Sequence, residues 1–285
     1  MSVWICLLSL LMSCWSALDG WAAERRTVSV VVGDNLTKTD RSVTIETLLL
    51  EEGALRSQGV GGEPLILWVD NVRAATAMTG GDGRAFFQYT PSKLGTFRVK
   101  VAVGESPRVA NAEGTGILAV WERRRPILLV EGAALLASME RAITPSLPMP
   151  MPLSVTVDKP AEHAADELER LSRFYYHLLY LVPPRGSALK SVRQFREWLE
   201  EHKFPQGVVL PADSNVDGLR GLIEQLRADG WENIKSGVGT TSVFAEALIA
   251  ERLTAVLITE DDKVKLPRKA RRVKEWKDAR KRLQE

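Results

Sequence analysis

The sequence predicts a multidomain chain in which an all-β sandwich is followed by a three-layer α/β domain with a mainly parallel sheet. Two observations lead to this fold class. Between residues 25 and 121, short runs rich in β-branched and aromatic residues are separated by Gly, Asp and Pro clusters, which is typical of strands joined by tight turns. After residue 125, apolar strand-like runs alternate with helix-like segments, which indicates crossover connections between parallel strands.

The composition is that of a globular protein. The chain has 285 residues, of which 45% are hydrophobic and 26% are charged, so it is long enough for two ordinary domains with their own cores. The formal net charge is +2. Residues 263–285 contain eleven Lys or Arg residues against three acidic ones, so the end of the chain is strongly basic and the remainder is acidic on balance.

Residues 1–24 predict a signal peptide or an N-terminal anchor. An apolar run ends in small residues and is followed by Glu24 and two arginines, which is the order of a hydrophobic region and a cleavage zone. The run is short and interrupted for a membrane-spanning helix. No Lys or Arg precedes the apolar run, although one does in a typical signal peptide, so an uncleaved anchor remains an alternative. The expected location is extracytoplasmic, in the periplasm, the envelope or the medium.

Both cysteines of the chain, Cys6 and Cys14, lie in this N-terminal segment. A chain cleaved near Ala23 would therefore have no disulfide and no thiolate metal site. Residues 11–14 also resemble a bacterial lipoprotein box, which would make Cys14 a lipidated first residue. The alternative is that the two cysteines only fill an apolar segment, since a free Cys behaves as a small hydrophobic residue.

The first domain is expected over residues 25–121. Its strands are predicted at residues 27–32, 42–50, 63–70, 84–90, 96–103 and 116–121. Residues 62–101 contain T-A-x-T-x-x-x-G-x-A-x-F-x-Y-T-P followed by an alternating strand, and they resemble bacterial immunoglobulin-like repeats. That resemblance implies an Ig-like sandwich. Asp82 and Gly83 are expected in a hairpin turn. A turn role is favoured for Asp70 and Asp82, with calcium binding as the alternative.

Residues 122–125 are a charged stretch that we interpret as a hinge, and the α/β domain is expected over residues 126–262. Its strands are predicted at residues 126–132, 178–182, 207–210, 233–239 and 254–259. Helical spacing is found at residues 134–142, 164–178, 191–204, 216–230 and 242–253. A Pro-rich stretch at residues 144–153 cannot continue a helix, so we expect an extended surface loop there.

In this order the second domain resembles the haloacid-dehalogenase (HAD) superfamily, and in particular the phosphatidate phosphatases of the lipin and actin-patch-protein type. The matching segments are PILLVEGAALL, YHLLYLVPPRG with FREWLEEHKFPQGVVL, and IKSGVGTTSVFAEALIAERLTAVLI. The resemblance implies a Rossmannoid fold. It also implies a Mg²⁺-dependent site in which an Asp nucleophile, an acid two residues later, a Ser or Thr and a Lys handle a phosphoryl group.

The residues that this chemistry needs are missing. Matching of strand ends puts Leu129 at the nucleophile position, Glu131 at the second acid and Val182 at the Ser/Thr position. Arg220 lies near the Lys position without matching it. No Asp or Glu occurs from residue 236 to 245, so the metal-binding acid is absent as well. Loss of one member of such a set costs orders of magnitude in rate, and the sequence therefore predicts a pseudophosphatase.

A residual polar set is expected at the carboxyl ends of the parallel strands, where open α/β sheets bind ligands. Glu131 is the remnant catalytic candidate, and Gly237 and Gly239 are candidates to present backbone N–H groups to an anion. The alternative for these glycines is a tight strand-to-helix turn. The other ligand-binding candidates are Arg185, Lys235, Thr240 and Thr241. The metal candidates are Glu131, Asp261 and Asp262.

Residues 263–285 predict a basic amphipathic helix. From residue 266 the apolar residues recur every three or four positions, and they include Trp276. Such a helix can lie on an anionic membrane with Trp276 at the headgroup level. Alternatively its apolar stripe docks on the α/β domain and its charges face water. A nucleic acid partner is not expected for an exported protein.

Taken together, these features predict an exported, non-catalytic binding or scaffold protein of the cell envelope with a possible anion site and no cofactor. The competing interpretation is a metal-dependent phosphoesterase that uses Mg²⁺ and a site rebuilt around Glu131 and Asp261. A third is that the two domains are purely structural. The three histidines show no zinc-ligand spacing.

Overall fold

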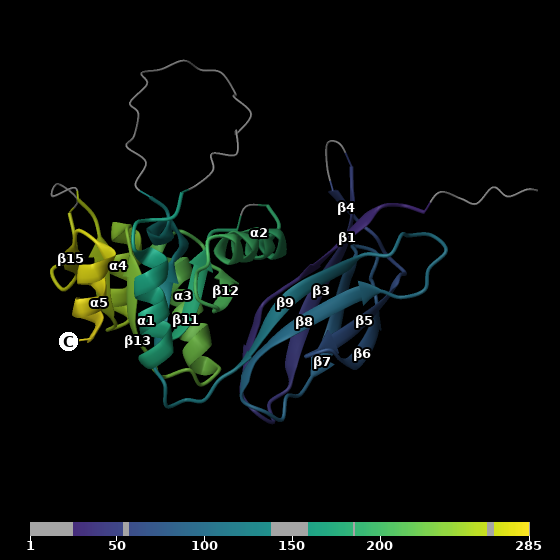
Figure 1. Cartoon of the computed structure of the whole chain (residues 1–285), viewed down its shortest axis with the longest axis horizontal. Helices are drawn as coiled ribbons and strands as arrows, with labels where there is room; N and C mark the ends of the chain where they lie inside the picture. The colour runs from purple at the N-terminus through teal and green to yellow at the C-terminus, as the bar shows by residue number, and fades with distance from the viewer. Residues whose placement is uncertain (1–24, 54–56, 138–158, 185, 261–264, 285) are drawn as a thin grey trace, which may run out of the picture.

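The chain forms two domains that lie side by side along its longest axis (Figure 1). The computed structural model describes residues 25–53, 57–137, 159–184, 186–260 and 265–284. The first domain consists of strands only, and the second places helices on both faces of a sheet. Both predicted fold types are therefore confirmed at this level.

The first domain is a sandwich of two sheets. One sheet contains β1 (Val28–Val32), β3 (Val43–Glu52), β4 (Ser57–Gly59) and β7 (Arg84–Tyr89). The other has the order β2 (Asn35–Thr37), β9 (Glu113–Val120), β8 (Gly95–Val103), β5 (Pro64–Val69) and β6 (Val72–Met78). All pairs are antiparallel except β2 with β9. Alternate side chains of the two sheets meet in one apolar core.

Three strands of the sandwich were not predicted. Strands β2 and β4 have only three residues each, which is too short for an alternation signal. Strand β6 is an edge strand whose side chains are mostly exposed and include three alanines, so it lacks a strand-like apolar pattern. Asp70 and Asn71 connect β5 to β6 with φ values of 51° and 63°, which confirms a turn role for Asp70.

The second domain is built on a fully parallel sheet. Its strands are β10 (Ile127–Glu131), β11 (His177–Val182), β12 (Val208–Pro211), β13 (Ile234–Gly239), β14 (Thr254–Ile258) and β15 (Arg271–Val273). Their spatial order is β12-β11-β10-β13-β14-β15, and every neighbouring pair is parallel. The chain therefore winds outward in one direction from β10 and then in the other from β13. The point of reversal lies between β10 and β13, where doubly wound sheets form a crevice.

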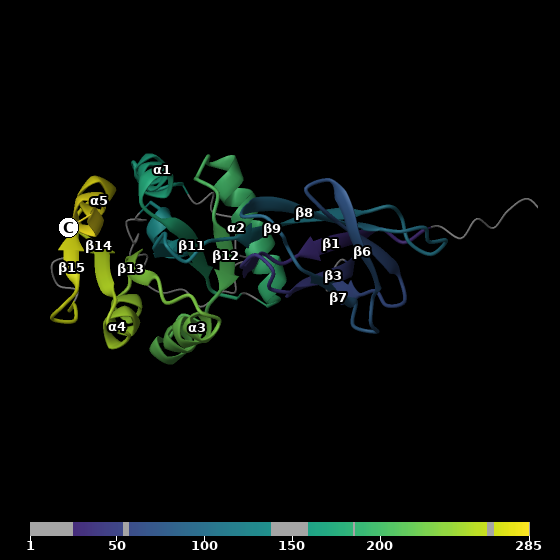
Figure 2. The ribbon, with the colours of Figure 1, turned by 90° about the horizontal axis from the view of Figure 1, so that it is seen from below.

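Helices cover both faces of this sheet, as Figure 2 shows. One face carries α1 (Ala164–Phe174), α2 (Ala188–Glu201), α5 (Trp276–Gln284) and the short 3₁₀ helix η1 (Gly132–Leu135). The other face carries α3 (Val216–Ala228) and α4 (Ser242–Ala250). Alternate residues of β10 enter opposite cores, since Leu129 packs with α3 and α4 while Leu128 and Val130 pack with the first group. Three layers follow from this alternation.

The boundary of one predicted helix needs correction. The sequence predicts a helix over residues 164–178, but α1 ends at Phe174 and His177 begins β11. The spacing of apolar residues that suggested a longer helix continues past Phe174 only because the buried residues of β11 follow shortly after the end of α1. The expected loop at residues 144–153 lies outside the described residues, as do residues 1–24 with Cys14. Within the ranges that the structure describes, no helix is long and apolar enough to cross a bilayer.

The prediction of one helix over residues 266–285 is wrong. Residues 271–273 form β15, which extends the parallel sheet, and only α5 is helical. Leu266 and Ala270 pack on the side of α3 and α4, whereas Trp276 packs on the opposite side, because the chain crosses the edge of the sheet between them. The α/β domain therefore extends past residue 262 and includes this segment.

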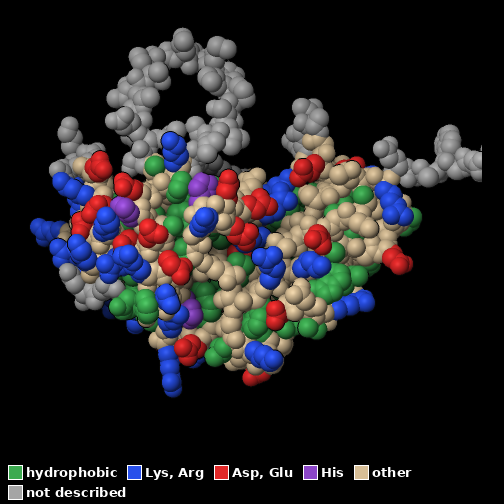
Figure 3. Space-filling model, viewed as in Figure 1, with side chains coloured by type: hydrophobic (Ala, Val, Ile, Leu, Met, Phe, Trp, Pro, Cys, Tyr) green, Lys and Arg blue, Asp and Glu red, His purple; other side chains and the backbone are tan. Residues whose placement is uncertain are grey.

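The docked alternative for the C-terminal apolar stripe is confirmed. Trp276 is only 2% exposed, and its Nε1 donates a hydrogen bond to the Ala134 carbonyl at 3.1 Å. A membrane contact through Trp276 at the headgroup level is thus excluded by its burial. The basic side chains of Lys277, Lys281 and Arg282 stay exposed, and Figure 3 shows Lys and Arg side chains gathered at this end of the α/β domain.

The two domains meet in a polar, buried junction in addition to the stretch at residues 122–125. Asp34, between β1 and β2, forms an ion pair with Arg196 of α2. Its carboxylate also accepts hydrogen bonds from Ile117 N at 3.0 Å and from Val209 N at 3.1 Å. Burial raises the pKa of Asp34, and Arg196 and the two N–H groups oppose that rise. One carboxylate thereby joins β9, α2 and the edge strand β12.

A second set of contacts reinforces the junction at the end of α3. Lys38 Nζ donates to the carbonyl of Asp229 at 2.8 Å and to that of Gly230 at 3.2 Å, and it lies 4.9 Å from the ring centre of Trp231. Arg41 pairs with the Asp229 carboxylate at 2.8 Å. Cations at the carboxyl end of a helix satisfy its last carbonyls and its dipole. These contacts hold the sandwich against the α/β domain.

Candidate functional site

The carboxyl edge of the sheet, at the reversal point between β10 and β13, is closed by Glu131. Glu131 is the last residue of β10. Its Oε2 accepts hydrogen bonds from Thr240 N at 2.7 Å and Thr241 N at 3.1 Å, and its Oε1 accepts one from the Thr241 hydroxyl at 2.6 Å. Backbone N–H groups in front of a helix are a ready anion site. Here the chain's own carboxylate occupies it.

Thr241 also starts α4. It is the N-cap residue, and its hydroxyl oxygen accepts a hydrogen bond from Phe244 N at 3.1 Å. The hydroxyl therefore donates to Glu131 and accepts from the helix at the same time. Glu131, Thr240 and Thr241, three of the predicted site residues, are brought together, and they satisfy one another.

Gly237 and Gly239 do not form an anion-binding turn, because both lie within β13. A Cβ on Gly237 would meet the Leu248 side chain at 2.6 Å and Phe244 at 3.0 Å. A Cβ on Gly239 would meet Phe244 at 2.4 Å and Glu131 Oε2 at 2.5 Å. These glycines allow α4 and the Glu131 carboxylate to approach the strand closely, so their role is in packing.

Lys235 lies at the opposite edge of the sheet from Glu131. Strand β13 begins at Ile234, so Lys235 is near the amino end of the strand, whereas the sequence interpretation placed it at the carboxyl end. It lines an open pocket of about 460 Å³ together with Arg227, Glu232, Glu251 and Arg252, among others. The prediction that Lys235 lies at the same edge of the sheet as Glu131 and Thr240 is therefore wrong.

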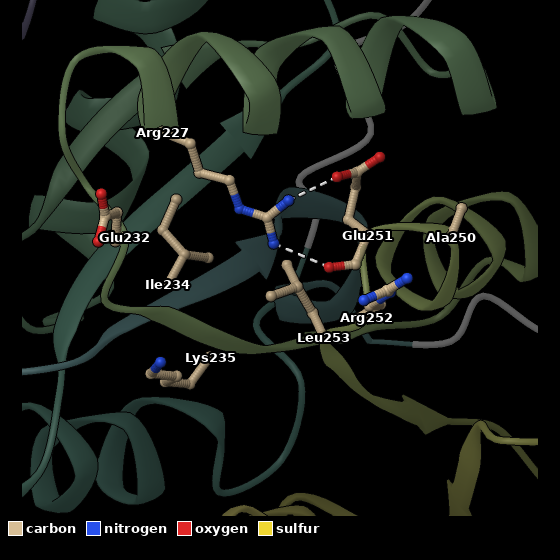
Figure 4. A pocket seen from close by; sticks show the side chains of 8 residues that line it. All are labelled: Arg227, Glu232, Ile234, Lys235, Ala250, Glu251, Arg252 and Leu253. Carbon is tan, nitrogen blue, oxygen red and sulfur yellow. Dashed lines mark hydrogen bonds and ion pairs between the residues drawn. The ribbon is translucent and has the colours of Figure 1, made fainter.

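An ion-pair cluster organises the pocket at Lys235, and Figure 4 shows the contacts between Arg227 and Glu251 from close by. The Glu251 carboxylate pairs with Arg220 at 3.0 Å and with Arg227 at 2.5 Å. Arg227 Nη2 also donates to the Glu251 carbonyl at 2.8 Å, and Lys235 lies apart from this pair (Figure 4). The cluster links α3 to the residue after α4, so Arg220 and Arg227 have a structural role.

The remaining predicted residues do not form a catalytic centre in the part of the chain that the structure describes. Leu129 is fully buried and Val182 nearly so, and Arg185, Asp261 and Asp262 lie outside the described residues. No three His, Cys, Asp or Glu side chains within the described ranges are placed to hold a metal ion. The Glu131 carboxylate is hydrogen-bonded to the loop before α4.

A second pocket, of about 390 Å³, lies between the two domains and was missed by the sequence interpretation. The sandwich side contributes Leu94, Gly95, Thr96, Val120 and Trp121, and the linking stretch contributes Glu122 and Arg125. The α/β domain contributes Glu169, Ser172, Tyr176, His177, Leu178, Pro205 and Gln206. The residues come from five separate segments, so no local pattern could have revealed this site.

Aromatic contacts hold the floor of this interdomain pocket. The ring of Trp121 stacks on the imidazole of His177 with centroids 4.3 Å apart and an angle of 4° between the planes. Trp231 meets Trp121 edge-on at 6.4 Å. Burial, with a smaller contribution from Arg125, lowers the pKa of His177 to about 4, so the imidazole is neutral at neutral pH.

Several polar atoms around the interdomain pocket have no hydrogen-bond partner among the described residues. They are Arg125 Nε and Nη2, His177 Nε2 and Asn233 Oδ1, and each is buried. Burial lowers the pKa of Arg125, while Glu122 raises it. The backbone here is well paired, since Asn233 Nδ2 donates to the Arg125 carbonyl and His177 N donates to the Pro126 carbonyl at 2.9 Å. These unpartnered atoms all belong to side chains of the described residues.

No protein-family model matches the chain, and no curated protein matches it. Among solved structures, the CARDB domain of the PF1109 protein from Pyrococcus furiosus, in complex with di-metal ions, is similar to 33% of this chain and 86% of its own, at 19% identity and a TM-score of 0.25. Fibronectin(III)-like modules of Clostridium thermocellum CbhA cover 32% of this chain and 94% of their own, at 11% identity and a TM-score of 0.24.

A family 123 glycoside hydrolase from Clostridium perfringens is similar over 83% of this chain and 73% of its own, at 7% identity and a TM-score of 0.22. These likenesses are remote, and the description of the fold rests on the strand pairing given above. The class that the fold and sites define is a two-domain protein in which a β-sandwich is joined to a doubly wound α/β domain through a buried polar junction.

Proposed function

We propose that the chain is an exported, non-catalytic binding or scaffold protein whose α/β domain derives from a HAD-like phosphatase. The observation that carries this proposal is the closed carboxyl edge of the sheet. The Glu131 carboxylate takes the two N–H groups and the hydroxyl at the start of α4, where a doubly wound sheet would receive an anionic ligand. The residues 1–24 support export by their composition alone.

Phosphoryl transfer by a HAD-type mechanism needs an accessible carboxylate nucleophile beside a bound metal. Leu129 is buried in the core and has no nucleophilic atom. Strand β10 extends to Glu131, so a nucleophile at the end of the strand would be Glu131, and the acid two residues later would be Ala133. In either alignment one of the two required acids is an apolar residue. This supports loss of catalysis.

The proposal also gives the sandwich an Ig-like character. Support comes from the sequence pattern at residues 62–101 and from the two-sheet arrangement. The HAD relationship is supported by the parallel order of the sheet and by the resemblance of the segments around β10, β11 and β13. In a scaffold, the junction at Asp34 and Arg196 fixes the angle between the two domains.

Turnover assays test this proposal directly. The full chain is incubated with p-nitrophenyl phosphate and with phosphatidate, each with Mg²⁺ or Mn²⁺, and the Glu131→Gln variant is the matched control. We expect wild type and variant to show the same background rate. Metal-dependent turnover that disappears in Glu131→Gln would overturn the pseudoenzyme proposal.

The second candidate function is a metal-dependent phosphoesterase built around Glu131 and Asp261. One observation favours it, which is that Glu131 ends the central strand of the sheet at the reversal point. This function predicts Mg²⁺ binding in calorimetry that is lost in both Glu131→Gln and Asp261→Asn. Identical Mg²⁺ titrations of wild type and the two variants would remove this candidate.

A further inference from the structure

We propose that the interdomain pocket binds a small organic monoanion, whose carboxylate pairs with Arg125 while its polar substituent faces Ser172 and Gln206. The pocket volume of about 390 Å³ lies in the range of small-molecule sites, and such sites favour domain interfaces. This binding function is separate from the carboxyl edge of the sheet, and it does not depend on a HAD origin or on catalysis.

The guanidinium of Arg125 is the main reason for this assignment. Two of its three nitrogens are buried, and neither has a hydrogen-bond partner among the described residues. A buried donor without a partner is costly, and the cost rises when the group is charged. Glu122 lines the same pocket and is mostly exposed, but no ion pair joins it to Arg125 in the described structure. A planar guanidinium matches a carboxylate with two parallel hydrogen bonds.

The stacked pair beside Arg125 supplies a second recognition element. The imidazole of His177 lies flat on Trp121, and its buried Nε2 has no partner among the described residues. A neutral imidazole nitrogen can donate to or accept from a ligand. Trp121 in turn is held by Trp231, so this wall is rigid. Preorganised walls reduce the entropy cost of binding a small molecule.

The charges that line the pocket select the class of anion. Among the described residues that line the pocket, Arg125 is the only Lys or Arg, and Glu122 and Glu169 are the acidic residues. Two carboxylates near one guanidinium repel a dianion such as phosphate more strongly than a monoanion. The Ser172 hydroxyl donates to the Glu169 carbonyl at 2.9 Å, so its oxygen is left to accept, and Gln206 supplies an amide to the same lining. These groups suit a hydroxyl substituent. A short hydroxy carboxylate therefore fits this lining.

Lactate is a suitable probe for the test, with lactamide as the uncharged isostere and inorganic phosphate as the competing anion class. Binding to the full chain is followed by calorimetry and by saturation-transfer NMR. We expect lactate to bind with a Kd on the order of 1 mM, as for a very small ligand. Lactamide should bind at least about ten-fold more weakly, because the charge-assisted bidentate contact with Arg125 is lost. Phosphate should also bind at least about ten-fold more weakly, because the two carboxylates of the lining oppose a dianion.

Arg125→Gln is the decisive variant, and Arg124→Gln is its matched control. Arg124 is the preceding residue and is exposed, so the two variants change the net charge equally. Lactate affinity should fall about ten-fold or more in Arg125→Gln and stay unchanged in Arg124→Gln. Arg125→Lys keeps the charge without the planar fork, and we expect it to bind weakly as well. His177→Phe, which keeps the stacking, should weaken binding less.

The proposal is overturned by any of four results. These are no saturable lactate binding by the wild type, equal lactate affinity of wild type and Arg125→Gln, equal affinity for lactate and lactamide, or tighter binding of phosphate than of lactate. Circular dichroism of each variant establishes that it is folded. If Arg125→Gln is unfolded, the comparison of wild type with Arg125→Lys decides the outcome in the same way.

Discussion

The two edges of the parallel sheet differ in how their polar groups are satisfied. At the carboxyl edge, Glu131 meets the N–H groups and the hydroxyl at the start of α4. At the amino edge, Arg125 and His177 keep buried nitrogens without a partner among the described residues. Doubly wound sheets bind ligands at their carboxyl edge. In this chain that edge is closed from within, whereas buried nitrogens without a partner among the described residues lie at the domain junction.

This difference shows that a binding site is recognised by buried polar groups that lack a hydrogen-bond partner, and not by its position in a fold. A carboxylate that fills an anion site removes the reason for an external anion to bind there. A half-buried guanidinium without a partner creates such a reason.

The largest effect is expected from Asp34→Ala. This variant leaves Arg196, which is 5% exposed, buried without its counter-ion. Removing one partner of a buried pair costs about 3–5 kcal/mol of unfolding free energy, and urea denaturation measures it. The control Arg26→Gln breaks an ion pair with Glu51 on the surface, and it should cost less than about 1 kcal/mol. Equal losses in both variants would contradict a structural junction at Asp34.

A similar but smaller loss is expected from Trp276→Ala, about 3 kcal/mol, because a buried indole and its hydrogen bond to Ala134 are removed. Denaturant unfolding measures the change. Phe174→Ala is the control, since Phe174 is 67% exposed, and it should change the stability by less than about 0.5 kcal/mol. An unchanged Trp276→Ala protein would argue against docking of α5.

The closed carboxyl edge is tested by Glu131→Ala. Removing the carboxylate leaves two backbone N–H groups and a threonine hydroxyl without their acceptor, which should cost about 1–3 kcal/mol. Inorganic phosphate should then restore part of the melting temperature in Glu131→Ala and leave the wild type unchanged. If phosphate does not change the melting temperature of Glu131→Ala, the loop before α4 does not bind an anion even when the Glu131 carboxylate is removed.

The smallest effect concerns His177 and pH. The pKa of His177 is lowered to about 4 in the folded protein and is about 6.5 in the unfolded chain. The neutral form is therefore favoured by folding, so the stabilisation is complete above pH 6.5 and is lost as the pH falls toward 4. Allowing for solvent around a partly exposed ring, we expect a loss of about 1 kcal/mol between pH 7 and pH 5.

His177→Phe separates this titration from the other groups of the protein. The phenyl ring keeps the stacking on Trp121 and cannot take up a proton, so the slope of unfolding free energy against pH between 5 and 7 should become shallower than in the wild type. Urea unfolding at several pH values gives this slope. The same slope in both proteins would show that His177 is solvated in solution.

Much of the fold could be predicted because the signals are local. The apolar runs that became β10, β11, β12, β13 and β14 are bounded by Gly, Pro or charged residues, and the helices between them have one apolar face. Strand β6 escaped prediction because an exposed edge strand of small residues has no apolar alternation. The segment from residue 266 was misjudged because spacing of three and four residues also arises when a strand and a helix pack in succession.

The candidate site was predictable only in part. Glu131, Thr240 and Thr241 were identified because the ends of neighbouring parallel strands meet at one edge. The strand that holds Lys235 was predicted to within one residue, at residues 233–239, but Lys235 was assigned to its carboxyl end although it is the second residue of β13. Whether Glu131 faced a ligand or its own loop could not be read from residue types, since the same carboxylate serves for both.

Two domains and the alternation of strands and helices could be inferred from the sequence alone, because both depend on residue types or on periodicity over a few turns. Only the tertiary structure decided that Glu131 closes the carboxyl edge, that Trp276 is buried, and that Asp34 meets Arg196 across 162 positions of the chain. Hydrogen bonds and ion pairs act over a few ångströms of space, and the distance between residues in space is set by the packing of the whole chain.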